Sequence, residues 1–207
     1  MRFPNAYKGL QKVLISQYLQ IISVFCMLVA GVLALVGAEM SNVDLMLAGG
    51  GLLLAGAVIA IIGLILNLIG LNQARRDEQN FMFAFIFAII AIATAVVGTI
   101  LLTPAPVFAD WLQFISKVAE ITVTEYTVIG IVTLATQLRR EDVAGFGRII
   151  MIIITILFAV VLFAELFANT MTAFADIMGT VSSALNLLVL ILFIILLVKS
   201  KKMLSKN

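Results

Sequence analysis

The chain has 207 residues, of which 63% are hydrophobic and only 12% are charged, and its mean hydropathy is +1.22. Soluble globular domains carry about a quarter charged residues, so this composition excludes an ordinary soluble domain. The sequence contains no histidine, the residue most used for metal binding and proton transfer near neutral pH, and we expect neither a metal nor a cofactor.

Six apolar segments are each long enough to cross a bilayer, since ~20 helical residues span the ~30 Å hydrocarbon core. They cover residues 13–37, 45–71, 81–102, 118–138, 149–168 and 177–198. We therefore expect an all-α polytopic membrane protein, a six-transmembrane-helix bundle that forms a single transmembrane domain over residues 1–207.

The first two segments carry small residues at intervals of seven. These are Ser16, Ser23, Ala30 and Gly37 in the first and Gly49, Gly56, Gly63 and Gly70 in the second. An interval of seven returns to nearly the same side of a helix, so each set forms one smooth stripe, which we call a seam. Seams allow helix backbones to approach closely, which matters because lipid gives helices no hydrophobic reason to associate.

The third segment has a seam with alternating intervals of four and three. It consists of Ala84, Ala88, Ala91, Ala95 and Gly98. Three consecutive seams indicate either a tight group of three helices within the chain or a surface partly reserved for a partner chain.

A resemblance accompanies the second seam. The run Gly63-Leu-Ile-Leu-Asn-Leu-Ile-Gly70-Leu-Asn-Gln73-Ala-Arg75-Arg76, followed by a small-residue helix, resembles small bacterial two-span membrane hairpins of unknown function. Those share a glycine-rich first helix, a Gln-x-Arg/Lys-Arg/Lys turn and an alanine- and glycine-rich second helix. The resemblance covers roughly residues 49–98, although Asn67 stands where such hairpins usually have glycine. It implies a helical hairpin and no particular chemistry.

Two charged turns resemble each other. They read Gln73-Ala-Arg75-Arg76-Asp77-Glu78 and Gln137-Leu-Arg139-Arg140-Glu141-Asp142. One interpretation is a duplicated hairpin, as in the internal repeats of many transporters. The other is electrostatic, because arginines favour the carboxyl end of one helix and acids favour the amino end of the next.

Between the third and fourth segments, Thr103-Pro104 ends a helix, because the residue before proline is disfavoured in helical conformation. Asp110 and Trp111 then predict a short outer interfacial helix around residues 108–117, since tryptophan is enriched at membrane interfaces.

Charge placement predicts the orientation. With both termini in the cytoplasm, every lysine and arginine except Lys117 lies on the inner side, as the positive-inside rule requires. We expect a multi-pass protein of the cell (plasma) membrane with this N-in/C-in topology. The basic tail, residues 199–207, serves as a topology anchor or as a binding segment for a partner or anionic lipid.

The fourth segment is the most polar, and Glu125 is its most notable residue. On a helical wheel it shares a face with Thr122, Tyr126 and Thr133, and Glu165 of the fifth segment lies at a comparable depth. A carboxylate at the centre of a membrane helix costs on the order of 2.5–3.5 kcal/mol on insertion scales. Glu125 therefore faces water, a partner or a cavity, or it is protonated and bonded to a neighbouring threonine.

Two classes of function remain, and neither is enzymatic, since the sequence shows no phosphate-binding loop and no nucleophile–base set. The first is a non-catalytic subunit or scaffold that binds another copy or a membrane partner protein through its seams. The seam residues we select are Gly49, Gly56, Gly63, Gly70, Ala84, Ala91 and Gly98. The alternative is a small channel or transporter for a cation or cationic solute that uses Glu125 and the outer acids. We expect the lipid bilayer, and no nucleic acid, as a partner.

Overall fold

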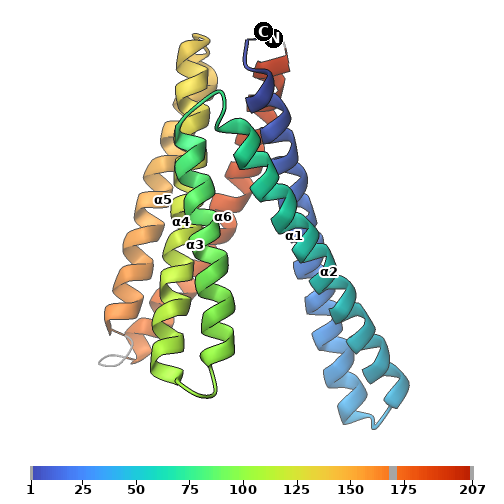
Figure 1. Cartoon of the computed structure of the whole chain (residues 1–207). Coiled ribbons are helices and arrows are strands. Elements are labelled where there is room, and N and C mark those ends of the chain that lie inside the picture. Colours follow the sequence, from blue (N-terminus) through green and yellow to red (C-terminus); the bar gives the residue numbers. More distant parts are fainter. Residues whose placement is uncertain (1, 168–171, 206–207) are drawn as a thin grey trace. The chain divides into compact units, whose positions relative to one another are not determined.

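The computed structural model describes residues 2–167 and 172–205, and this part of the chain forms six α-helices (Figure 1). They are α1 (Pro4–Glu39), α2 (Val43–Ala74), α3 (Asn80–Leu101), α4 (Pro106–Gln137), α5 (Glu141–Phe167) and α6 (Thr172–Ser205). All six are long and apolar enough to cross a membrane. The prediction of an all-α protein with six apolar helices is therefore confirmed. The predicted end of the fifth span, Ala168, lies outside the described residues.

The chain divides into two compact units. Gln11–Gly70 form one, which we call the hairpin unit because it contains most of α1 and α2. Met1–Leu10 and Leu71–Asn207 form the other, which we call the main unit and which contains α3 to α6. The single transmembrane domain over residues 1–207 stays a prediction.

The hairpin unit reverses direction in a short turn after α1. The Asn42 amide donates to the Gly37 carbonyl at 2.8 Å and the Ser41 amide to the Ala38 carbonyl at 3.2 Å, the pattern of a Schellman motif. Ser41 has the left-handed φ of 52° that this motif needs. The Asn42 side chain then caps α2, because its Oδ1 accepts hydrogen bonds from the amides of Asp44 and Leu45. Backbone groups at the end of α1 and at the start of α2 thus find hydrogen-bond partners within this short turn.

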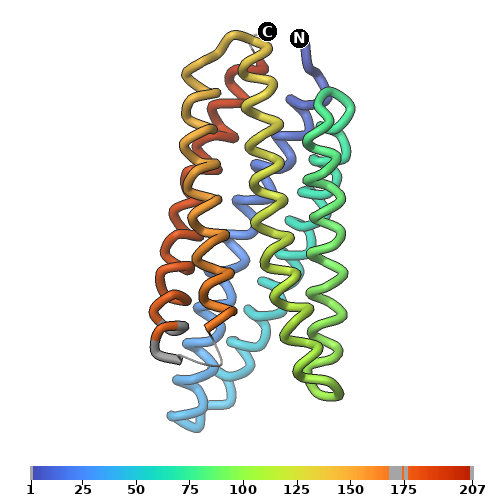
Figure 2. Tube along the Cα trace, turned by 90° about the vertical axis from the view of Figure 1, so that its left-hand side faces the viewer, coloured from blue at the N-terminus to red at the C-terminus, as the bar shows by residue number. Residues whose placement is uncertain are grey.

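In the main unit, α3 to α6 run up and down, and α4 contacts all three of the others (Figures 1 and 2). Its buried core includes Phe81 of α3, Ile131 and Leu134 of α4 and Ile150 of α5. The Phe81 ring lies directly over Gly130, where an added Cβ would come within 2.8 Å of the ring. Glycine at this position therefore allows α3 and α4 to approach closely.

The separate helix predicted around residues 108–117 does not form, and this prediction is wrong. Those residues are the first turns of α4, which runs without interruption from Pro106 to Gln137. Pro106 occupies the first helical position, where its fixed φ favours the helix and its missing amide is not needed. Because no proline or glycine follows before Gly130, nothing breaks the helix at the charged residues where a boundary was predicted.

Candidate functional site

The seams of α1 and α2 lie against each other in the hairpin unit. A Cβ atom added to each of three α2 glycines would lie 3.0 to 3.4 Å from a carbonyl oxygen of α1. The pairs are Gly49 with Ala30, Gly56 with Ser23 and Gly63 with Ser16. Each glycine thus faces a member of the first seam, and the two heptad patterns match in antiparallel register. Gly70, the last residue of the second seam, is buried as well.

A buried hydrogen bond joins the two helices at the middle of this contact. The Ser23 hydroxyl donates to the carbonyl of Gly56 at 2.8 Å. Close backbone approach makes the bond possible, because the serine side chain is short and the glycine has none. The second seam is therefore engaged inside the chain.

The third seam packs on α4. The carbonyl of Ala91 accepts a hydrogen bond of 2.9 Å from the buried Ser116 hydroxyl, and a Cβ on Gly98 would lie 3.4 Å from the Ala109 carbonyl. Ala84 is also buried. The second and third seams thus face different helices and form two separate pairs.

Sequence reasoning missed the α4 side of this contact. Ala109 and Ser116 are seven residues apart, and Gly130 continues the same interval two heptads later. This spacing is the signal for the contact in the sequence, and the acids and threonines of the same segment make its polar face more conspicuous. Ala109 and Ser116 are both buried.

The hydroxyl groups of the polar face point back to their own helix. Thr122 donates to the Val118 carbonyl at 2.8 Å, and Thr133 donates to the Ile129 carbonyl at 3.0 Å. Such bonds to the preceding turn satisfy a threonine hydroxyl without any other partner.

Tyr126 serves as a packing residue between α4 and α3. Its ring centroid lies 5.3 Å from that of Phe83 and 5.8 Å from that of Phe87, and the second pair is stacked. These distances are typical of aromatic pairs that stabilise helix contacts. The ring therefore belongs to an apolar contact with α3.

Glu125 is half-buried in α4, and Glu165 is exposed near the end of α5. The hydroxyls of Thr122 and Thr127 both donate to backbone carbonyls, so neither donates to Glu125. The ion pairs of the described chain join other residues, Arg140 with Asp142 and Arg148 with Glu141. That Glu125 and Glu165 share one site stays a prediction.

The turn between α2 and α3 caps the start of α1 within the main unit. The Asp77 carboxylate accepts hydrogen bonds from the Ala6 amide at 2.7 Å and from Asn5 Nδ2 at 2.9 Å. A carboxylate is favourable here because the first amides of a helix have no partner within it and carry partial positive charge. Asp77 thus connects two segments that are far apart in the sequence.

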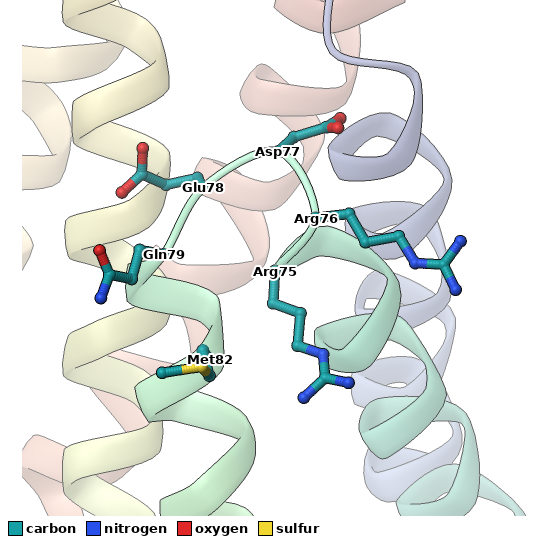
Figure 3. A pocket seen from close by; sticks show the side chains of 6 residues that line it. All are labelled: Arg75, Arg76, Asp77, Glu78, Gln79 and Met82. Carbon is teal, nitrogen blue, oxygen red and sulfur yellow. The ribbon is translucent and has the colours of Figure 1, made fainter.

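The same turn forms an open pocket of about 500 Å³. It is lined by Arg75, Arg76, Asp77, Glu78, Gln79 and Met82. Figure 3 shows that the charged side chains fan out from the turn in different directions. The Arg75 guanidinium lies 5.3 Å from the Phe85 ring centroid. Because its charges do not converge, this hollow does not resemble a binding site.

The turn between α4 and α5 has a different structure. Arg139 adopts the left-handed region with φ of 55°, and the Arg140 amide donates to the Ala135 carbonyl at 2.8 Å. The Arg140 side chain donates from Nε and Nη2 to the Asp142 carboxylate at 3.1 and 3.0 Å. This hydrogen bond and the carboxylate charge raise the pKa of Arg140. The two similar sequences therefore form different turns, and their duplication stays a hypothesis.

Among the described residues, no group of three or more histidine, cysteine, aspartate or glutamate side chains could hold a metal ion. The best-defined features are instead two helix–helix contacts and a charged end of the main unit.

The chain matches no protein-family model, and comparisons with curated proteins and with solved structures found no match.

Proposed function

We propose that the protein is a multi-pass, non-catalytic subunit or scaffold of the cell membrane, with both termini in the cytoplasm. Six long apolar helices support the membrane location. The orientation is supported by charge, because the basic residues gather at one end of the main unit, where positive charge favours the cytoplasmic side. They include Arg75, Arg76, Arg139, Arg140, Lys199 and Lys202. Lys206, another predicted inner residue, lies outside the described residues.

The observation that carries the scaffold proposal is a second stripe of small residues on α2. Ala48, Gly51 and Ala55 follow intervals of three and four and are all exposed. A Cβ added to Gly51 would meet nothing within 4 Å. The first stripe of α2 is engaged by α1, whereas this second stripe is open within the hairpin unit, and small residues there allow a helix of another chain to approach closely.

The threonines and Tyr126 of α4 support a non-catalytic role. Its threonine hydroxyls are used within the helix, and Tyr126 packs against phenylalanine rings. Catalysis needs polar groups that converge on a substrate, whereas these groups turn back to their own helix or to apolar neighbours. Packing between helices is the role that these contacts support.

The proposal is tested by filling the open stripe. The double variant Gly51→Leu/Ala55→Leu makes this face of α2 bulky without touching the seam that faces α1. Leu54→Ile, at an exposed position beside it, is the matched control. We expect cross-linking in native membranes to trap a complex with a second copy or a partner in wild type and control, and to lose it in the double variant. An undiminished complex in the double variant would reject this face as the docking surface.

Transport is the second candidate function, and the position of Glu125 favours it. This carboxyl group is half-buried at membrane depth and belongs to none of the ion pairs in the described chain. In proteoliposomes, a transporter would carry a cation or proton flux that Glu125→Gln abolishes. Glu120→Gln, at an exposed position of the same helix, is the control and would keep the flux. Absence of flux in the wild type would reject transport.

A further inference from the structure

A small pocket lies where the α4–α5 turn meets the last turns of α6. It is lined by Arg140, Asp142, Val143, Lys199, Lys202 and Met203 and has a volume of about 230 Å³. We call it the basic pocket. Sites for drug-sized ligands usually measure roughly 300–1,000 Å³, so this volume suits one small charged group.

The rim of the basic pocket carries more positive than negative charge. Arg140, Lys199 and Lys202 face a single acid, Asp142. Lys199 lines the pocket, and its ammonium group also lies 4.4 Å from the centroid of the Phe146 ring on α5. Arg140 uses Nε and Nη2 for its bonds to Asp142, so the N–H groups of Nη1 remain for another acceptor.

The floor of the basic pocket is apolar. Val143 and Met203 are each only 1% exposed. Apolar surface also continues from the pocket along the sides of the main unit, where Ile149 of α5 and Ile195 and Val198 of α6 are exposed. The pocket therefore lies at the boundary between a charged end and two lipid-compatible helix surfaces.

We propose that the basic pocket binds the phosphate of an anionic phospholipid, whose acyl chains lie along the exposed apolar surface of α5 and α6. Lysine and arginine side chains beside a membrane attract anionic lipid, each by about five-fold in affinity, and arginine binds phosphate through paired N–H groups. Inorganic phosphate shares the headgroup chemistry but has no acyl chains. The phospholipid is the better ligand because it uses both the charged rim and the apolar surface. This site is independent of the scaffold proposal.

The test uses the purified full chain in detergent with phosphatidylglycerol and phosphatidylcholine of the same acyl chains, and native mass spectrometry counts the bound lipids. The wild type is expected to retain one phosphatidylglycerol in preference to phosphatidylcholine. Lys199→Gln/Lys202→Gln should weaken this retention about 30-fold, from the loss of two lysines. The control Lys201→Gln/Arg148→Gln removes the same charge from neighbouring positions that do not line the pocket, and it should retain the lipid.

A variant that should bind more tightly completes the test, because misfolding can explain a loss of lipid binding but not a gain. Asp142→Asn removes the acid of the pocket and releases the Arg140 side chain, so it should bind phosphatidylglycerol several-fold more tightly. Millimolar inorganic phosphate should leave the lipid bound, since it lacks the apolar contacts.

Four results would overturn the proposal. They are equal losses in the two double variants, no preference for phosphatidylglycerol, weaker binding by Asp142→Asn, and displacement by inorganic phosphate. The first would indicate diffuse attraction to the whole basic end, and the last would indicate a site for free anions.

Discussion

The Ser23 hydroxyl of α1 donates a hydrogen bond to the backbone carbonyl of Gly56 of α2, 2.8 Å away in a buried contact. The same arrangement recurs in the main unit, where the Ser116 hydroxyl of α4 donates to the Ala91 carbonyl of α3 at 2.9 Å. In both pairs a serine on one helix meets a small residue in the seam of the other. Hydrogen bonds between membrane helices contribute about 0.6 kcal/mol on average, so close backbone packing supplies most of each contact.

Gly56→Leu should destabilise the hairpin unit. A Cβ at this position would already lie 3.3 Å from Cys26 and Met27, and a larger side chain must force α1 and α2 apart. Overpacking of this kind costs about 1–3 kcal/mol, measurable as a lower free energy of unfolding in detergent titrations. Leu54→Ile, exposed on the same helix, should change it little. Equal stability of the two variants would show that the seam is not a tight contact.

Asp77→Ala should loosen the first turn of α1. Loss of a helix-capping side chain costs about 0.5–2 kcal/mol, and here it leaves the Ala6 amide without its carboxylate acceptor. Hydrogen–deuterium exchange of the amides near Ala6 should therefore become faster. Glu78→Ala is the control, because Glu78 Oε1 accepts its hydrogen bonds from Asn80 at the start of α3. Unchanged exchange near Ala6 in Asp77→Ala would contradict the capping role.

Arg139→Gly should stabilise the turn between α4 and α5. Arg139 has a left-handed φ of 55°, a conformation that glycine adopts without strain. The left-handed region costs other residues roughly 1–2 kcal/mol, so the thermal midpoint should rise by a few degrees for a gain of about 1 kcal/mol. Arg139→Ala removes the same charge but keeps the Cβ atom, and it should not share the gain. A glycine variant no more stable than the alanine variant would refute this account.

Much of the fold is predictable from the sequence, because an apolar segment of membrane length has few alternatives to a helix. The second and third segments were predicted at 45–71 and 81–102, and the helices are Val43–Ala74 and Asn80–Leu101. α2 exceeds its apolar segment because backbone hydrogen bonding continues into its flanks, whereas α3 has the predicted length and is shifted by one residue. The start of α4 at Pro106 is not predicted correctly, because the charged residues near 117 suggest a helix boundary, although charge alone does not end a helix.

The candidate sites were less predictable. The sequence shows that a small-residue seam exists, but several seams look alike, and only the fold pairs Gly56 with Ser23 and Gly98 with Ala109. The polar face of α4 suggested a pathway, whereas a threonine hydroxyl can bond either to its own helix or to a neighbour. The basic pocket combines residues from α5, α6 and the turn before α5, and no local pattern brings these together.

The orientation can be tested with single cysteines on a Cys26→Ala background. If both termini lie in the cytoplasm, Gln79 lies on the inner side of the membrane and Thr103 on the outer side. Both residues are exposed. An impermeant thiol reagent added to intact cells should label a cysteine at Thr103 and leave one at Gln79 unlabelled until the membrane is opened. The reverse pattern would invert the orientation.

The most direct test of the scaffold account is the mass of the assembly that the protein forms in its own membrane. Native mass spectrometry of the full chain, released in mild detergent without added cross-linker, should give a complex that contains a second copy or a partner. Gly51→Leu/Ala55→Leu should give the single chain with bound lipid, and Leu54→Ile should keep the complex. A wild-type protein that is a single chain at every concentration, and that carries a cation flux dependent on Glu125, would contradict the scaffold account.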